Sequence, residues 1–222
     1  MATTATRPEE QLEDPLAYLP CSRIVEYGKG KVIYSAEQPH SNLNLIVEGK
    51  VKVLRVAGDG QEVVLDIYRT DEFFGESSLL GQAPVEQAVA LEHTRLMTWS
   101  MPEIADIIAR SPRLGIALLQ VLVQRSLDLR NRLESFCVDN IARRLARSLI
   151  RYSQRLGDRQ EDGSVQMMPF THELLSQVVG TSREIVTHHM SNFRREGYLR
   201  YSRKGIALYD DALRDWLRQP AS

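Results

Sequence analysis

Between residues 22 and 99, short runs of apolar residues alternate with polar residues and are interrupted by glycine-containing turns. Two such runs cover residues 43–47 and 50–56, and a third covers 63–68. The glycine-rich stretch 58–60 between the last two predicts a hairpin turn, because its residues tolerate positive φ at little cost. Short strands separated by regular turns predict a β-barrel or a β-sandwich.

The pattern becomes helical at Met101-Pro102, and a second helix start follows at Ser111-Pro112. Serine can cap a helix, and proline fits its first position. We therefore predict one unbroken helix over residues 112–137. A further basic helix is expected from Ile141 to about Arg155, after a hinge at Asp139-Asn140.

The long helix carries apolar residues at a seven-residue spacing. Leu122, Leu129 and Phe136 form one row, and a second row passes through Leu118, Arg125 and Arg132, with Leu133 beside it. One small domain cannot cover so long an apolar row, so we expect the helix to pack against a second copy of itself. The expected contacts are Leu118, Leu122, Leu129, Leu133 and Phe136. The alternative is an amphipathic helix that packs only on its own domain.

Residues 171–197 have the pattern of two short helices joined by a tight turn. Thr171 can cap the first helix, Gly180 can end it in a left-handed conformation, and Ser182 can cap the second. Two helices joined in this way form a helix-turn-helix. Residues 198–209 then predict a tight β-hairpin, which would complete a winged helix-turn-helix.

The second helix of this motif has two different faces. Val186, His189, Met190 and Phe193 form an apolar stripe, whereas the opposite face is polar and of mixed charge. Arginine donates twice to guanine, glutamate accepts from cytosine, and threonine offers a hydroxyl and a methyl group. Helix starts and a basic hairpin tip can bind phosphates. We expect DNA contacts from Thr171, Ser182, Arg183, Glu184, Thr187, His188, Ser191, Arg203 and Lys204. The alternative for this face is ordinary solvation.

Composition agrees with two domains of different charge. The chain has 222 residues and a net charge of −1, but residues 140–222 contain 14 Lys or Arg against 9 Asp or Glu, a net of +5, which leaves −6 for the rest. A basic half is typical of a domain that binds a polyanion. The apolar runs are too short to cross a bilayer, and the N-terminus lacks the layout of a secretion signal. We expect a cytoplasmic protein without membrane association.

Other kinds of chemistry find little support in the sequence. The two cysteines, Cys21 and Cys137, lie far apart and show no metal-ligand spacing, which favours reduced thiols. No nucleophile–base pair or acidic pair has convincing spacing, so an enzyme is not expected. A sensor that acts through protein contacts, with a degenerate DNA domain, is the alternative from another functional class. Loss of specific DNA protection in an Arg183→Ala variant would separate it from a DNA-binding regulator.

Taken together, these motifs resemble the cyclic-AMP receptor protein and fumarate–nitrate reduction regulator (CRP/FNR) family over nearly the whole chain. The resemblance lies in Glu48-Gly-Lys-Val51, in Phe74-Gly-Glu76 and in Gly180-Thr-Ser-Arg-Glu-Ile-Val186. It implies an α+β chain with a cyclic-nucleotide-binding-type β-barrel (jelly-roll) over residues 1–110, a dimerisation helix over 111–138 and a winged helix-turn-helix over 139–222. It also implies a homodimer on a near-palindromic DNA site, and contact with RNA polymerase.

The chain departs from the family pattern at two positions of the second helix. His188 stands where the family usually has an arginine that reads a base, which changes the expected half-site. His189 stands at a position that is usually apolar, and we expect a partly buried core histidine there rather than a sensor.

A further departure concerns the nucleotide pocket. Glu86 stands where cyclic-nucleotide responders carry the arginine that pairs with the cyclic phosphate, and a carboxylate repels a phosphate. Leu129-Arg130 replaces the Thr-Ser pair that reads adenine. We therefore expect no dependence on cyclic AMP. Gly75, Glu76 and Arg130 stay candidates for contact with an unidentified effector.

No cofactor is expected. An iron–sulfur cluster needs about four cysteine ligands, and the chain has two. Haem stays an open alternative through His40, His93 or a cysteine, although a lone histidine in a strand is more often structural.

Overall fold

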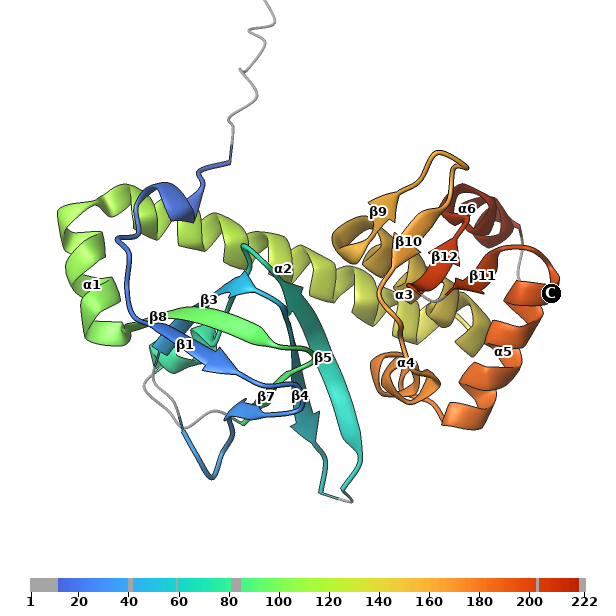
Figure 1. Cartoon of the computed structure of the whole chain (residues 1–222), viewed down its shortest axis with the longest axis horizontal. Helices are drawn as coiled ribbons and strands as arrows, with labels where there is room; N and C mark the ends of the chain where they lie inside the picture. The colour runs from blue at the N-terminus through green and yellow to red at the C-terminus, as the bar shows by residue number, and fades with distance from the viewer. Residues whose placement is uncertain (1–11, 40–41, 59, 81–84, 203, 220–222) are drawn as a thin grey trace, which may run out of the picture.

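The computed structural model describes residues 12–39, 42–58, 60–80, 85–202 and 204–219 (Figure 1). Arg203, expected at the wing tip, and His40, considered as a haem ligand, lie outside the described residues.

The N-terminal domain consists of two antiparallel four-stranded sheets, with strand orders β1-β8-β3-β6 and β2-β7-β4-β5. Ile46, Phe74 and Leu96 from the first sheet pack against Tyr34 and Val51 from the second. Among the described residues no strand of one sheet pairs with a strand of the other, so the expected jelly-roll forms as a sandwich rather than as a closed barrel. The strands are β1 (Ile24–Tyr27), β2 (Val32–Tyr34), β3 (Asn42–Glu48), β4 (Lys50–Val56), β5 (Glu62–Arg69), β6 (Phe73–Phe74), β7 (Gln87–Ala90) and β8 (Thr94–Ser100), and the 3₁₀ helices are η1 (Pro15–Ala17) and η2 (Glu76–Leu80).

Gly49 is the point where the chain passes from one sheet to the other, since β3 and β4 are consecutive but belong to different sheets. Its φ is 100°, in the region that favours glycine. A Cβ at this position would lie 2.6 Å from the carbonyl oxygen of His93 and from Oγ1 of Thr94. The predicted turn after residue 48 is therefore a crossing between sheets, and it requires glycine.

Two helices follow the sandwich, α1 (Met101–Arg110) and α2 (Pro112–Val138). The unbroken helix predicted over residues 112–137 is confirmed, with Pro112 in its first turn. Ser111 occupies the position before it, but its side chain makes no capping hydrogen bond, so that part of the prediction is wrong. Figure 1 shows α2 extending from α1 along the sandwich to the C-terminal domain.

The C-terminal domain is a winged helix-turn-helix. Its elements are α3 (Ile141–Leu156), β9 (Asp158–Arg159), β10 (Val165–Met167), α4 (His172–Val179), α5 (Arg183–Arg195), β11 (Leu199–Ser202), β12 (Gly205–Leu208) and α6 (Asp210–Arg218). The strands form one sheet in the order β11-β12-β10-β9. Leu149, Leu175, Val186 and Leu208 are fully buried in its core.

The two domains share a packed interface on β5. Val64 and Ile67 of this strand are fully buried in the same apolar cluster as Leu149 of α3 and Leu175 of α4. The outer face of the sandwich thereby holds the helix-turn-helix in a defined position, and α5 lies on the far side of α4 from the sandwich (Figure 1).

Candidate nucleic-acid interface

The residues predicted to shape the helix-turn-helix do so through short-range bonds. Oγ1 of Thr171 accepts from the backbone N–H of Leu174 at 3.0 Å, and Oγ of Ser182 accepts from that of Ile185 at 3.4 Å. Between the helices, Gly180 has φ 72° and ψ 54°, the left-handed conformation. The two caps and the glycine turn are therefore confirmed, and they determine the angle at which α5 leaves α4.

The inner face of α5 anchors the helix in the domain. Val186, Met190 and Phe193 are buried. His189 is half-buried beside them, as expected. Burial, followed by the neighbouring His188, lowers the pKa of His189, which keeps its ring neutral near pH 7.

The outer face of α5 is exposed over residues 183–191. Arg183, Glu184, Thr187, His188 and Ser191 are all exposed there. Hydrogen bonds from its own backbone N–H and from Ser182 lower the pKa of Glu184, so its carboxylate stays ionised at neutral pH. The structure thus brings these five predicted side chains together on one accessible surface, which we call the reading face. Thr171 and Ser182, at the starts of α4 and α5, are also exposed.

The wing is the hairpin of β11 and β12, in which Ser202 is paired with Gly205. Lys204 at its turn is exposed, and its backbone N–H donates to Oγ of Ser202 at 3.2 Å. Arg200 is bonded to Asp162, in the loop between β9 and β10, so its charge is partly neutralised. Lys204 therefore carries an accessible positive charge at the tip.

Two residues of this surface, His172 and Tyr201, were missed by the sequence analysis. His172, the first residue of α4, places Nδ1 2.8 Å from Oγ1 of Thr187 and Nε2 2.9 Å from the hydroxyl of Tyr201. It thereby connects α4 with the reading face and the wing. No sequence pattern indicates such a bridge, because its ends lie 15 and 29 residues from His172.

In the region where cyclic-nucleotide responders of the family bind their ligand, Glu76 and Glu86 are both engaged with neighbouring side chains. Nη1 of Arg125, on α2, lies 2.5 Å from a carboxylate oxygen of Glu76, and Glu86 accepts from Oγ of Ser77 at 2.5 Å. Burial, followed by the negative charges of Glu86 and Glu76, raises the pKa of Tyr34.

Gly75 and Arg130, the other two effector candidates, lie in different settings. Gly75 has φ 87°, and a Cβ there would lie 2.8 Å from Asn42 O and Asn44 Nδ2, so its role in the structure is to permit close backbone packing. Arg130 is exposed on α2, whereas Arg125, five residues earlier, pairs with Glu76. Arg125 is therefore the cation that the sequence analysis missed.

The second row of the long helix faces inward. Leu118 is half-buried against the β-domain, and Arg132 donates to the carbonyl oxygens of Val64 and Leu65. Leu118 is therefore a core contact, unlike the other four residues expected at a dimer interface. The exposed row alternates in steps of three and four, and its apolar members are Leu119 (60% exposed), Leu122 (36%), Leu129 (58%), Leu133 (65%) and Phe136 (44%). We call it the seam.

The expected hinge lies at the break between α2 and α3. The carboxylate of Asp139 accepts from Oγ of Ser135 at 2.7 Å, from Nε of Arg147 at 2.6 Å and from Nε of Arg143 at 3.3 Å. Burial alone would raise the pKa of Asp139, but Ser135 and Arg147 outweigh it and lower the pKa. Asn140 then caps α3 by accepting from Arg143 N at 3.0 Å.

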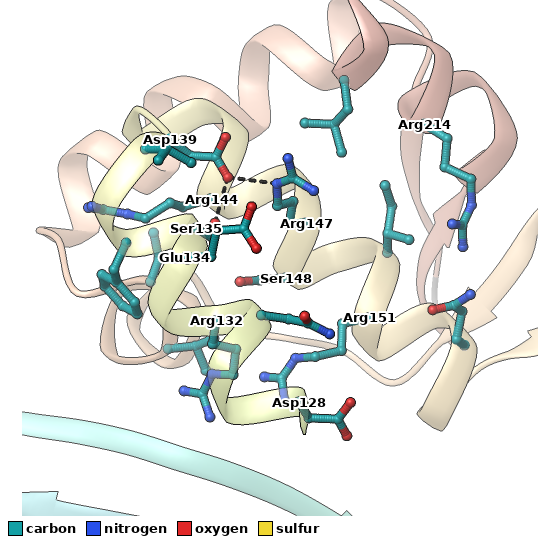
Figure 2. Close-up of a pocket in the computed structure, with 18 of the residues that line it drawn as sticks. Asp128, Arg132, Glu134, Ser135, Asp139, Arg144, Arg147, Ser148, Arg151 and Arg214 are labelled. Carbon is teal, nitrogen blue, oxygen red and sulfur yellow. Dashed lines mark hydrogen bonds and ion pairs between the residues drawn. The ribbon is translucent and has the colours of Figure 1, made fainter. Parts of the chain in front are cut away.

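A pocket of about 640 Å³ lies beside this hinge, between α2, α3 and α6 (Figure 2). Its arginines are largely engaged: Arg147 pairs with Asp139, and Arg214 with Asp210. Asp128 and Glu134 of α2 add negative charge to the same wall. Six arginines and three carboxylates line the pocket, so its lining is net positive, although several of these arginines are engaged in ion pairs.

No group of three or more potential metal ligands occurs among the described residues. Within those same ranges, no helix has the length and apolar character needed to cross a membrane. Cys21 and Cys137 are both exposed and free.

Comparisons with known proteins place this architecture. The sequence matches the family model for the cyclic nucleotide-binding domain over residues 24–111, and the model for the Crp-like helix-turn-helix domain over residues 143–215. It is 30% identical over 188 residues to the CRP-like cAMP-activated global transcriptional regulator of Mycobacterium tuberculosis, which covers 84% of each chain. It is 31% identical to the transcriptional regulator SdrP of Thermus thermophilus, over 78% of this chain and 81% of that one.

A solved structure of a CRP/FNR-family transcriptional regulator from Thermus thermophilus superposes with a TM-score of 0.67, at 26% identity, over 90% of this chain and all of that one. A second solved structure, FixK2 from Bradyrhizobium japonicum, has the same fold, with a TM-score of 0.77 at 18% identity over 90% of this chain and 99% of that one. On this evidence, the chain belongs to the CRP/FNR family of DNA-binding transcription regulators.

Proposed function

We propose that the protein acts as a homodimer that recognises a near-palindromic DNA site through its two reading faces and does not need cyclic AMP. One observation carries the proposal: the outer face of α5 is exposed and polar over residues 183–191, while its opposite side is locked in the domain core. A helix held in this way can enter the major groove with its first residues facing the bases.

Each residue of the reading face has a proposed role. Arg183 donates twice to a guanine, Glu184 accepts from a cytosine, and His188 reads a third base in place of the usual arginine. Thr187 and Ser191 line the same surface. Phosphate contacts come from Thr171, Ser182, Lys204 and Arg203, of which the first two lie at helix starts.

The dimer is proposed to form along the seam of α2. Apolar side chains that alternate in steps of three and four form the contact surface of a coiled coil. Leucines that stay more than half exposed over several turns are costly in water, and a second copy of the helix is the partner that matches their spacing. The dimer would then place the recognition helices about one DNA turn, roughly 34 Å, apart.

Independence from cyclic AMP rests on the composition of the nucleotide pocket. The relative from Mycobacterium tuberculosis is described as cAMP-activated. In this chain, burial and then the negative charges of Glu86 and Glu76 raise the pKa of Tyr34. A cyclic phosphate would be repelled by the carboxylate of Glu86, and Arg125 is already paired with Glu76. Any effector that uses Gly75 and Glu76 would meet Arg125 rather than Arg130. Contact with RNA polymerase is proposed on the family relationship alone.

The decisive experiment is selection of bound sites from random DNA by the purified protein, with and without a metabolite extract. We expect an enriched palindrome whose half-sites are about ten base pairs apart. Arg183→Ala should lower the affinity for that site by at least about tenfold and leave binding to random DNA nearly unchanged. Arg195→Ala removes the same charge from the other end of α5 and should preserve the preference. Absence of any enriched sequence would refute the proposal.

A further inference from the structure

His172 joins three elements of the DNA-binding domain through its two ring nitrogens. It is the first residue of α4, Thr187 lies on α5, and Tyr201 lies on β11. The distances are 2.8 Å from Nδ1 to Oγ1 of Thr187 and 2.9 Å from Nε2 to the hydroxyl of Tyr201. The imidazole is half-buried, and the rings of His172 and Tyr201 are 6.2 Å apart, tilted by 51°. One side chain therefore contacts both the recognition helix and the wing.

The direction of these hydrogen bonds follows from the proton of Thr187. Its hydroxyl has one hydrogen, which it donates to the carbonyl oxygen of Arg183 at 2.8 Å. Oγ1 of Thr187 must therefore accept from His172, so Nδ1 carries the proton. In a neutral imidazole Nε2 is then an acceptor, and Tyr201 donates to it. All three hydrogen bonds therefore have the same direction: Tyr201 donates to His172, His172 donates to Thr187, and Thr187 donates to the backbone of α5.

The electrostatic setting favours this neutral form. Burial, followed by the positive charge of Arg183 on α5, lowers the pKa of His172. Its other polar contact, Tyr201 on β11, is uncharged near neutral pH, because burial raises the pKa of that phenol although Arg194 opposes the shift.

We propose that His172 is a positioning residue for DNA specificity, which holds the reading face and the wing in one relative geometry. This role rests on the proposed function above. The hydroxyl proton of Thr187 is already donated to the backbone, and one oxygen lone pair already accepts from His172. Thr187 can therefore offer a base only its methyl group and its second lone pair. This arrangement favours contact with a thymine methyl group over donation to a base acceptor. Tyr201 likewise supports the wing and does not donate to a phosphate.

The test compares affinities for the selected site and for random DNA. His172→Ala should lower the ratio of these two affinities by about tenfold, because the geometry of both contacts is lost, and should change the affinity for random DNA by less than about twofold. His172→Asn keeps a donor near the place of Nδ1 and should recover part of the ratio. The Tyr201→Phe substitution should lower this affinity ratio in the wild-type protein but should not lower it further in the His172→Ala variant. Gln177→Ala, on the same helix but bonded to Glu62 of the β-domain, is the matched control and should leave the ratio unchanged.

The proton assignment is tested without DNA, by nitrogen NMR of the His172 ring at pH 7 in the full-length protein. We expect a protonated Nδ1 and an unprotonated Nε2. The opposite tautomer, or a selected site whose ratio is the same in wild type and His172→Ala, would overturn the role of His172 alone. If the wild type selects no sequence at all, the proposed function fails, and this role fails with it.

Discussion

Arg155 on α3 donates from Nη1 to both carboxylate oxygens of Asp66 on β5, at 2.9 Å each, and so ties the DNA-binding domain to the sandwich. Its Nη2 also lies 3.0 Å from Glu72, and Arg151 reaches Asp66 at 3.2 Å. All four side chains are three-quarters or more covered. The interface thus combines an apolar cluster with a network of ion pairs, and it sets the orientation of the reading face.

Asp66→Asn should weaken this interface, because it leaves the covered Arg151 without its carboxylate partner and Arg155 with Glu72 alone. We expect the free energy of unfolding to fall by about 2–4 kcal/mol, measured by urea denaturation followed by tryptophan fluorescence. Asp211→Asn removes a carboxylate from an exposed pair on α6 and should change it by less than about 0.5 kcal/mol. Equal free energies of unfolding for the two variants would contradict the proposed importance of the ion pairs that Asp66 makes with Arg155 and Arg151.

The carboxylate of Asp66 also makes the interface between the two domains sensitive to low pH. Burial raises the pKa of Asp66, but Arg155 and Arg151 outweigh burial, so the pKa lies below its ordinary value. The stabilisation is then complete above the unfolded-state pKa of about 4 and is lost as the pH falls through the folded-state pKa. We expect the loss of stability below about pH 4 to be smaller in Asp66→Asn than in wild type. Parallel acid denaturation curves would argue against this assignment.

Glu184→Ala and Lys204→Ala should affect DNA binding in different ways. Glu184 is placed to read a base, so its removal should relax the preference at one position and leave affinity for random DNA nearly intact. Lys204 is proposed to contact a phosphate, so its removal should weaken binding to all sequences and reduce the salt dependence by about one unit of slope. Titrations on selected and random DNA at several salt concentrations measure both effects. If both variants lose affinity equally on the two DNAs, the assigned roles are wrong.

The seam predicts the effect of a charge on oligomeric state. Leu129→Glu would place two like charges opposite each other in a dimer, and we expect the dimer dissociation constant to rise by about a hundredfold. Gln124→Glu adds the same charge to the opposite face of α2 and should leave the dimer intact. Sedimentation at a series of concentrations measures the constant. A monomeric wild type, or an unaffected Leu129→Glu dimer, would remove the seam as the interface.

Cyclic AMP should not tighten binding to the selected site. The carboxylate of Glu86 repels the phosphate, and Arg125 is already paired with Glu76. Titration of operator binding with and without the nucleotide measures this, and the cAMP-activated relative from Mycobacterium tuberculosis serves as the positive control in the same assay. A clear gain in affinity for this chain would show that the interpretation of the pocket is wrong.

The helix-turn-helix could be predicted in detail because its signals are local. The caps at Thr171 and Ser182 and the left-handed turn at Gly180 each depend on residues within four positions along the chain. The hairpins and the long helix follow in the same way from short-range pattern. Ser111 shows the limit of this reasoning, since a suitable residue in the right place need not form the capping bond.

Contacts between distant segments were not predictable from the pattern. A seven-residue period reveals two rows on a helix but not which row faces its own domain, and so Leu118 was expected at the dimer interface although it packs on the β-domain. The bridge made by His172 and the pairing of Arg155 with Asp66 join elements whose proximity arises only from the tertiary fold.

Phe136, a member of the seam, also lies against the turn between α4 and α5. A Cβ on Gly180 in that turn would lie 3.3 Å from Cε1 of the Phe136 ring. The end of α2 therefore bears directly on the turn of the helix-turn-helix, with the guanidinium of Arg144 stacked 4.9 Å from the same ring. In a dimer, the turns of both helix-turn-helix motifs would pack against the same pair of α2 helices. The width of this helix pair would then set the separation of the two recognition helices. DNA binding should therefore be impaired less by a changed base within a half-site than by a base pair inserted between the half-sites.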